Sequence, residues 1–225
     1  MRHMIAATLV LGATAANVYA DIIADSVADF GGVQGANGWH YGYVEPSTSS
    51  AVQLMPQFGM HAGSPALSEE PAWFISYSGD PIEFPTPYTN ITAAGGHPNG
   101  GTNAIAVEHW TVRRWVAPFA GTFDFSGLLG DYAADFGFGG DGVLAEAQVD
   151  GVAVWSFSTS GTTAEFPYSF EASLAAGQAI DFVVKPKLNE NTDYYIWTVQ
   201  VVPGPSALLV VAFGACGLAV RRRRD

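Results

Sequence analysis

The stretch GVLAEAQV-DG-VAVWSF, residues 142–157, carries the clearest structural signal of this chain. Its first half alternates apolar and polar side chains, with Val143 and Val149 on one face and Glu146 and Gln148 on the other. This two-residue period is typical of a strand with one buried face. Asp-Gly is a preferred two-residue hairpin turn, and a β-branched and aromatic run follows it. The stretch therefore predicts an antiparallel β-hairpin.

The same pattern extends over the middle of the chain. Short β-branched and aromatic runs are separated by Gly, Pro, Asn and Asp, and no long 3.6-residue period appears. We expect further strands at residues 39–45, 72–77, 103–117, 121–129, 166–172, 180–184 and 194–202. This spacing predicts an all-β fold, an antiparallel jelly-roll-like β-sandwich formed by one domain at residues 21–201, with a closed barrel as the alternative.

Charge limits the partners of this domain. The chain has 9 basic and 21 acidic residues, but residues 21–202 hold only 4 of the basic residues and 20 of the acidic ones, a net charge of −16. Such a surface repels phosphate backbones, so we exclude a nucleic-acid partner. A charged fraction of 13% with 13% aromatic residues also argues against intrinsic disorder.

The first 20 residues read as a secretory signal peptide. Arg2 and His3 precede an apolar run, and Val18 and Ala20 place small residues before a cleavage point ahead of Asp21. We expect a signal helix over residues 1–20, removal by signal peptidase, and export. Cleavage after Ala16 and a buried N-terminal helix are the alternatives.

The last 24 residues, 202–225, combine a proline motif, an apolar run and a basic end. Pro203, Gly204, Pro205 and Ser206 precede the uncharged run 207–220, and Arg221, Arg222, Arg223 and Arg224 follow it. Fourteen helical residues span about 21 Å, less than a typical bilayer core, which predicts a short transmembrane helix and transient membrane anchoring. The lone cysteine, Cys216, lies in this run, which excludes an internal disulfide, a thiolate metal site and a cysteine nucleophile in the exported domain.

These three elements resemble the PEP-CTERM sorting tail of bacteria with exosortase systems. The usual motif of that family is Val-Pro-Glu-Pro, and this chain has Gly204 in place of the glutamate. The resemblance implies processing by an exosortase-like protease near the proline motif and delivery to the cell surface or extracellular matrix. A simple C-terminal membrane anchor is the alternative.

Two segments of the domain offer candidate ligand-binding residues. In a strand, Trp39, Tyr41 and Tyr43 share one face, which suits either stacking on sugar rings or packing in the core. Arg113 and Arg114, which precede Trp115, point to opposite faces of their strand. We expect one arginine to pair with a carboxylate from Glu108, Asp124 or another strand, and the other to be available for a ligand.

These segments also resemble a domain that recurs in exported bacterial proteins, including other PEP-CTERM proteins. The shared patterns are Gln-Gly-x-Asn-Gly-Trp-x-Tyr-Gly-Tyr at residues 34–43, Arg-Arg-Trp at 113–115, Gly-Asp-Gly-Val at 140–143 and Asp-Phe-Val-Val at 181–184. The resemblance implies a carbohydrate-binding-like β-sandwich whose activity is not settled.

Metal and catalytic signals are weak. Asp135 and Asp141 flank a glycine-rich loop whose oxygen atoms suit Ca²⁺, although the same loop suits a simple strand connection. We expect no other cofactor. The chain has no Gly-x-Ser-x-Gly, His-Glu-x-x-His or P-loop motif.

The sequence therefore favours an exported, non-enzymatic protein of the cell surface or extracellular matrix, with a matrix polysaccharide as the candidate ligand. Two alternatives stay open: a secreted polysaccharide hydrolase or lyase, and a purely structural matrix component.

Overall fold

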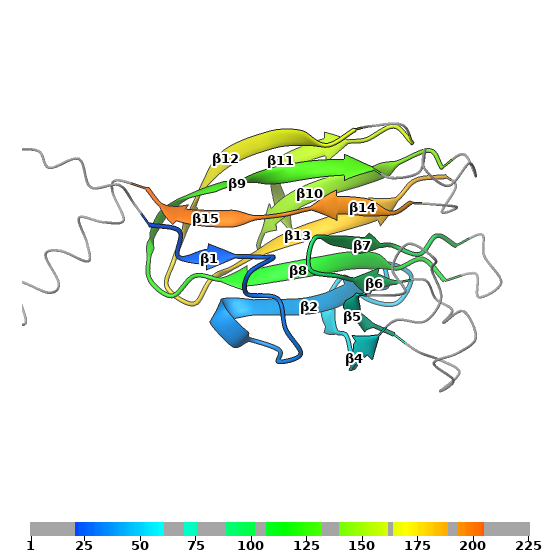
Figure 1. Ribbon diagram of the computed structural model, residues 1–225, viewed down its shortest axis with the longest axis horizontal. Coiled ribbons are helices and arrows are strands. Elements are labelled where there is room, and N and C mark those ends of the chain that lie inside the picture. Colours follow the sequence, from blue (N-terminus) through cyan, green and yellow to red (C-terminus); the bar gives the residue numbers. More distant parts are fainter. Residues whose placement is uncertain are drawn as a thin grey trace, which may run out of the picture.

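The computed structural model describes residues 21–60, 70–75, 89–101, 107–131, 140–161, 164–188 and 193–204. Two antiparallel sheets pack against each other over this part of the chain, so the expected all-β sandwich is confirmed (Figure 1). A single 3-10 turn, η1 (Ala36–Gly38), interrupts the strands among these residues. They include no helix long and apolar enough to cross a membrane. The signal helix and the C-terminal helix expected from the sequence lie outside the described residues.

The smaller sheet has six strands in the order β11-β10-β13-β8-β2-β3 within the described part. Their bounds are β11 (Val152–Ser158), β10 (Val143–Val149), β13 (Ala179–Pro186), β8 (Trp110–Val116), β2 (Trp39–Val44) and β3 (Gln53–Leu54). The expected hairpin joins β10 to β11, with Val149 opposite Val152. Asp150 and Gly151 have φ angles of 52° and 77°, as the type I′ turn between twisted strands requires.

The larger sheet follows the order β1-β15-β9-β14-β7-β6-β5-β4, and β12 pairs along β9. Its bounds are β1 (Ala24–Asp25), β15 (Gln200–Pro203), β9 (Gly121–Asp131), β14 (Tyr195–Trp197), β7 (Gly95–His97), β6 (Asn90–Ile91), β5 (Pro71–Phe74), β4 (Gln57–Met60) and β12 (Phe166–Leu174). β1 lies beside β15, with Ala24 opposite Val201 (Figure 1). The first and last described strands are therefore neighbours.

Aromatic side chains from both sheets fill the interior. The Trp115 ring of β8 meets Phe123 of β9 edge to face at 5.2 Å between centroids, and Phe182 of β13 meets Trp197 at 5.3 Å. Edge-to-face pairs at this distance add to the stabilisation from apolar burial. The inner face of the six-stranded sheet is thus buried in the core, whereas its outer face can contact other molecules.

Candidate functional site

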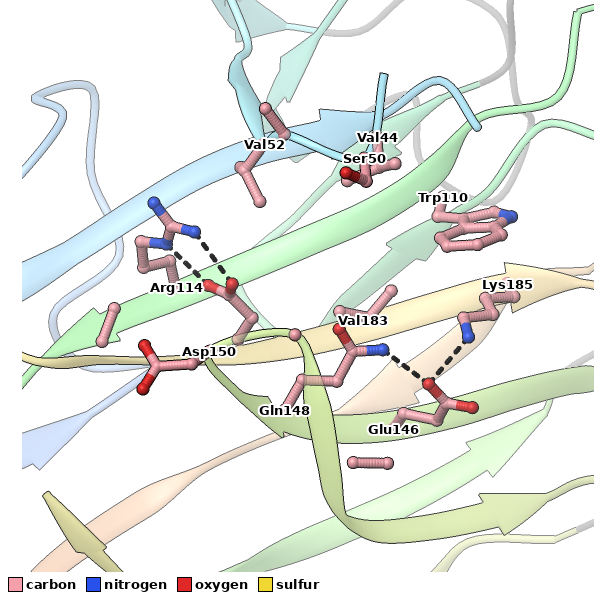
Figure 2. Close-up of a pocket in the computed structure, with 15 residues that line it drawn as sticks. Val44, Ser50, Val52, Trp110, Arg114, Glu146, Gln148, Asp150, Val183 and Lys185 are labelled. Carbon is pink, nitrogen blue, oxygen red and sulfur yellow. Dashed lines mark hydrogen bonds and ion pairs between the residues drawn. The ribbon is translucent and has the colours of Figure 1, made fainter. Parts of the chain in front are cut away.

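A groove of about 830 Å³ lies on the outer face of the six-stranded sheet (Figure 2). Strands β2, β8, β13 and β10 supply most of it, and residues 50–52 and the β10–β11 turn border it. Binding pockets for small ligands span this range of volume. Its lining residues are Val44, Ser50, Ala51, Val52, Trp110, Arg114, Glu146, Gln148, Asp150, Gly151, Ala153, Ala179, Asp181, Val183 and Lys185.

Valine side chains form the floor of the groove. Val44 and Val183 line it, and Val112, opposite Val183 in the ladder, packs between them. All three are buried although they lie on the outer face, because Val52 and Trp110 pack over them. Gly42 makes this cover sterically feasible, since a Cβ there would lie 2.5 Å from the Gln53 carbonyl oxygen. The apolar surface that a ligand can contact is therefore provided mainly by Val52 and the Trp110 ring, which are only partly buried.

An arginine–aspartate pair occupies one end of the groove. Arg114 donates from Nε to Asp181 Oδ1 at 2.6 Å and from Nη2 to Asp181 Oδ2 at 2.8 Å. The two residues are neighbours across β8 and β13, so the ladder register sets the geometry. The bidentate hydrogen bonds with Asp181 raise the pKa of Arg114.

A second polar cluster occupies the other end, beside Trp110 (Figure 2). Lys185 Nζ lies 2.7 Å from Glu146 Oε2 and 4.4 Å from the centre of the Trp110 ring. Gln148 donates to the same Glu146 oxygen at 2.6 Å. Burial raises the pKa of Glu146, but the hydrogen bonds from Lys185 and Gln148 outweigh it, and the net shift is downward.

The groove is elongated in the direction of the strands. Trp110 and Arg114 are four residues apart on β8, which corresponds to about 13 Å in an extended strand. The valine floor lies between them. Gln148 is opposite Asp181 in the β10–β13 ladder and donates to Glu146, so polar side chains continue along the groove from Arg114 to Lys185, where the Trp110 ring lies.

The candidate aromatic residues from the sequence lie mainly in the interior. Trp39, Tyr41 and Trp115 are at most 1% exposed, and Trp39 and Tyr41 are packed against Phe182 and Trp73. Tyr43 is partly buried against the same core. The shared face of these side chains is therefore the inner face of β2, which leaves them no contact with a ligand in the groove.

The two arginines point to opposite faces, as the sequence indicated. Arg114 faces the groove and pairs with Asp181 on another strand, which is one of the expected partnerships. Arg113 is 5% exposed and points between the sheets, where it donates to the carbonyl oxygens of Thr92, Ala93 and Trp197. Of the six candidate ligand-binding residues, Arg114 is the one that lines the groove.

Five further residues line the groove that were not predicted as site residues: Trp110, Glu146, Gln148, Asp181 and Lys185. Glu146, Gln148, Asp181 and Lys185 lie opposite an apolar, buried set on β10 and β13, so the two-residue alternation of these strands indicated their face, whereas β8 shows no such alternation around Trp110. The sequence pattern does not show in which order these strands lie in the sheet.

The metal and sorting candidates are mostly outside the described residues. Asp135 lies there, and so do Pro205, Ser206 and Arg221–Arg224. Asp141 accepts a hydrogen bond from the Leu188 backbone N–H at 3.0 Å. The described part of the chain contains no group of three or more His, Cys, Asp or Glu side chains suited to a metal ion. Pro203 ends β15, and Gly204 donates from its backbone to Thr122 at 2.8 Å.

Comparisons with known proteins give structural neighbours at low similarity. No family model matches the chain, and no curated protein matches it. A family 35 carbohydrate-binding module from an environmental isolate is 16% identical, with a TM-score of 0.31, over 73% of this chain and 93% of that chain.

Two further neighbours are also built on carbohydrate-binding modules. The CBM51-2 and INT domains of Clostridium perfringens ZmpB are 13% identical over 72% of this chain and 32% of that chain, with a TM-score of 0.36. The C-terminal family 6 module of a marine laminarinase from Zobellia galactanivorans is 8% identical over 72% and 98%, with a TM-score of 0.30. At this similarity the function has to be argued from the groove itself.

Proposed function

We propose that this chain is an exported glycan-binding protein and that the groove on the outer face of the six-stranded sheet is its binding site. The observation that carries the proposal is the composition of the groove. The partly exposed Val52 and Trp110 side chains lie beside side chains that donate and accept hydrogen bonds, Arg114, Gln148 and Glu146 among them. A sugar ring presents the same two surfaces, an apolar C–H face and a rim of hydroxyl groups.

Two features of the groove support a binding role over a catalytic one. The acidic groups Asp181 and Glu146 are each held by a cation, at 2.6 Å and 2.7 Å. Against the opposing effect of burial, the hydrogen bonds from Lys185 and Gln148 lower the pKa of Glu146, whereas glycoside hydrolysis needs one carboxyl group that is protonated and able to donate. We therefore assign hydrogen bonding and positioning, rather than proton transfer, to these two groups.

The finer parts of the proposal concern topology and destination. A jelly-roll-like topology is supported by β8, β9 and β10, which alternate between the two sheets, as do β12, β13 and β14. Export by a signal peptide, a short C-terminal membrane helix, and sorting to the cell surface or matrix rest on residues 1–20 and 202–225 as sequence. Ca²⁺ binding near Asp135 and Asp141 remains a proposal of the same kind.

Binding is tested by affinity electrophoresis and calorimetry of the protein on soluble polysaccharides. The set contains hydroxyethylcellulose, xylan, galactomannan, dextran, alginate and polygalacturonate. We expect at least one polymer to bind, and Trp110→Ala to weaken that binding by about tenfold, since stacked aromatic contacts carry a large share of such affinities.

The matched control is Phe58→Ala, which removes a 38% exposed ring from β4 of the other sheet. This variant should bind as the native protein does. Absence of binding to every polymer, or equal binding by the Trp110→Ala protein, would contradict the proposed function.

A further inference from the structure

The groove holds an unusual share of the basic groups of the domain. Residues 21–202 contain four basic residues, and two of them, Arg114 and Lys185, line the groove. Three acidic residues, Glu146, Asp150 and Asp181, line it as well. The groove therefore has a formal charge of −1 within a strongly acidic domain.

Both groove cations already have a carboxylate partner. Arg114 uses two of its N–H groups on Asp181, and these side chains are 34% and 13% exposed. Lys185 contacts Glu146, and these side chains are 18% and 15% exposed. An incoming carboxylate or sulfate could reach only the N–H groups that Arg114 and Lys185 do not use on Asp181 and Glu146, and it would then lie beside the negative charge of those carboxylates.

The remaining hydrogen-bonding capacity suits hydroxyl groups. A hydroxyl donates one hydrogen bond and accepts others, so it can contact a carboxylate and its cation together without breaking the pair. The carboxylate oxygens of Asp181 and Glu146 have lone pairs beyond those used by Arg114, Lys185 and Gln148. An anionic group can only accept hydrogen bonds, and it is repelled by the same oxygens.

We infer that the groove selects uncharged glycan chains over chains that carry carboxylate or sulfate groups. This inference rests on the proposed function and adds the ligand class. Asp181 and Glu146 act as positioning residues, because they hold Arg114 and Lys185 in place and oppose the binding of anions. Trp110 and Arg114, about 13 Å apart along β8, leave room for a chain of more than one ring.

The test compares one backbone in two charge states. Hydroxyethylcellulose and carboxymethylcellulose form one pair, and dextran and dextran sulfate form another. Any other neutral polymer that binds is compared with its own product after oxidation of the primary alcohols to carboxylates. We expect the native protein to bind the neutral member of each pair at least about tenfold more tightly.

Two variants with the same change in total charge separate a local effect from a global one. Asp181→Asn releases Arg114 in the groove, whereas Asp124→Asn removes one charge from β9 of the other sheet. Asp181→Asn should improve binding of the anionic polymer at least threefold relative to the neutral one, and Asp124→Asn should leave this ratio unchanged. Glu146→Gln provides a second groove variant if Asp181→Asn does not fold.

The outcomes distinguish the inference from the proposed function. Equal or tighter binding of the anionic polymers, reduced by Trp110→Ala, would overturn the inference while the glycan-binding function stands. Equal responses of the Asp181→Asn and Asp124→Asn proteins would also overturn it, because the preference would then reflect the total charge. If no polymer binds, the proposed function fails and the inference fails with it.

Discussion

Arg113 is a charged side chain inside the sandwich, and it joins the two sheets. It belongs to β8, and it donates to Trp197 O at 2.9 Å, Thr92 O at 2.8 Å and Ala93 O at 3.1 Å, all of which belong to the other sheet or its connections. Burial lowers its pKa, but a guanidinium stays charged in a protein. Backbone carbonyl dipoles therefore compensate a charge that has no carboxylate contact among the described residues.

We predict that Arg113→Met destabilises the protein by at least about 3 kcal/mol, because three buried carbonyl oxygens lose their donor. Urea unfolding measures the loss. Arg114→Met on the adjacent, partly exposed position is the control and should cost about 1 kcal/mol. Similar losses for both variants would show that Arg113 does not link the sheets.

The surroundings of His40 make the stability of the folded protein depend on pH. It neighbours Arg114 in the ladder, and burial and the Arg114 charge both lower its pKa below the usual 6.5. The unfolded chain therefore takes up a proton at a higher pH than the folded protein, so stability is complete above about pH 6.5 and decreases as the pH falls below it.

Replacing His40 with Gln should remove part of that decrease between about pH 6.5 and pH 5, as urea midpoints across this range will show. His109 shifts in the same direction, because its burial outweighs the opposing effect of Glu45, so some decrease should persist. If the native and His40→Gln proteins have parallel pH profiles, His40 does not contribute.

At the scale of elements, the close pairing of β3 with β2 at Gly42 shapes the groove. Leu54 pairs with Gly42, and a Cβ at Gly42 would also lie 2.8 Å from Val52 Cγ1. The glycine is required here for close approach, since the strand backbone itself is ordinary. Residues 50–52 can then border the groove and cover the valine floor.

Gly42→Ala should therefore displace β3, cost about 1–3 kcal/mol and weaken glycan binding. Gly59→Ala in β4 is the matched control, because a Cβ there meets nothing within 4 Å. Thermal unfolding and the binding assay follow both variants. Native-like stability and binding of the Gly42→Ala protein would refute the role of this close β2–β3 approach.

The elements that the sequence predicts well are long strands of seven or more residues. β10, β11, β12 and β13 lie within about two residues of the expected strands. The short strands β3, β4, β6 and β7 were not predicted, because two to four residues show no period. The expected strand at residues 194–202 is two strands, β14 and β15, since Trp197 pairs with Leu129 whereas Gln200 pairs with Ser126.

Only part of the candidate site could be predicted, because the pattern of a single strand does not show how the strands are arranged in the sheets. The alternation in β2 places Trp39, Tyr41 and Tyr43 on one face, but a single strand does not show which face is covered by the second sheet. The pairing of Arg114 with a carboxylate could be expected from its chemistry. Its partner Asp181 is 67 residues away, and only the β8–β13 register brings the two together.

At the scale of the molecule, the first and last described strands, β1 and β15, lie side by side at one edge of the larger sheet. β15 lies between β1 and β9, and Val201, opposite Phe125, is fully buried. The ladder continues to Pro203 opposite Phe123, and the Gly204 backbone donates to Thr122. The fold thus includes Val202, Pro203 and Gly204, which the sequence assigned to the sorting tail.

This placement constrains where the proposed C-terminal processing occurs. Cleavage before Gln200 would remove β15 and expose the apolar side chains that it covers, at a cost that a domain of marginal stability does not tolerate. We predict that the exported, processed protein ends at or beyond Gly204, as intact-mass measurement of the secreted chain will show. A folded secreted form that ends before Gln200 would contradict the prediction.

The variant Gly204→Glu tests the same placement independently. A Cβ at this position would lie 3.0 Å from Thr122 O, so the glutamate of the usual motif should loosen the end of β15 and increase its proteolysis.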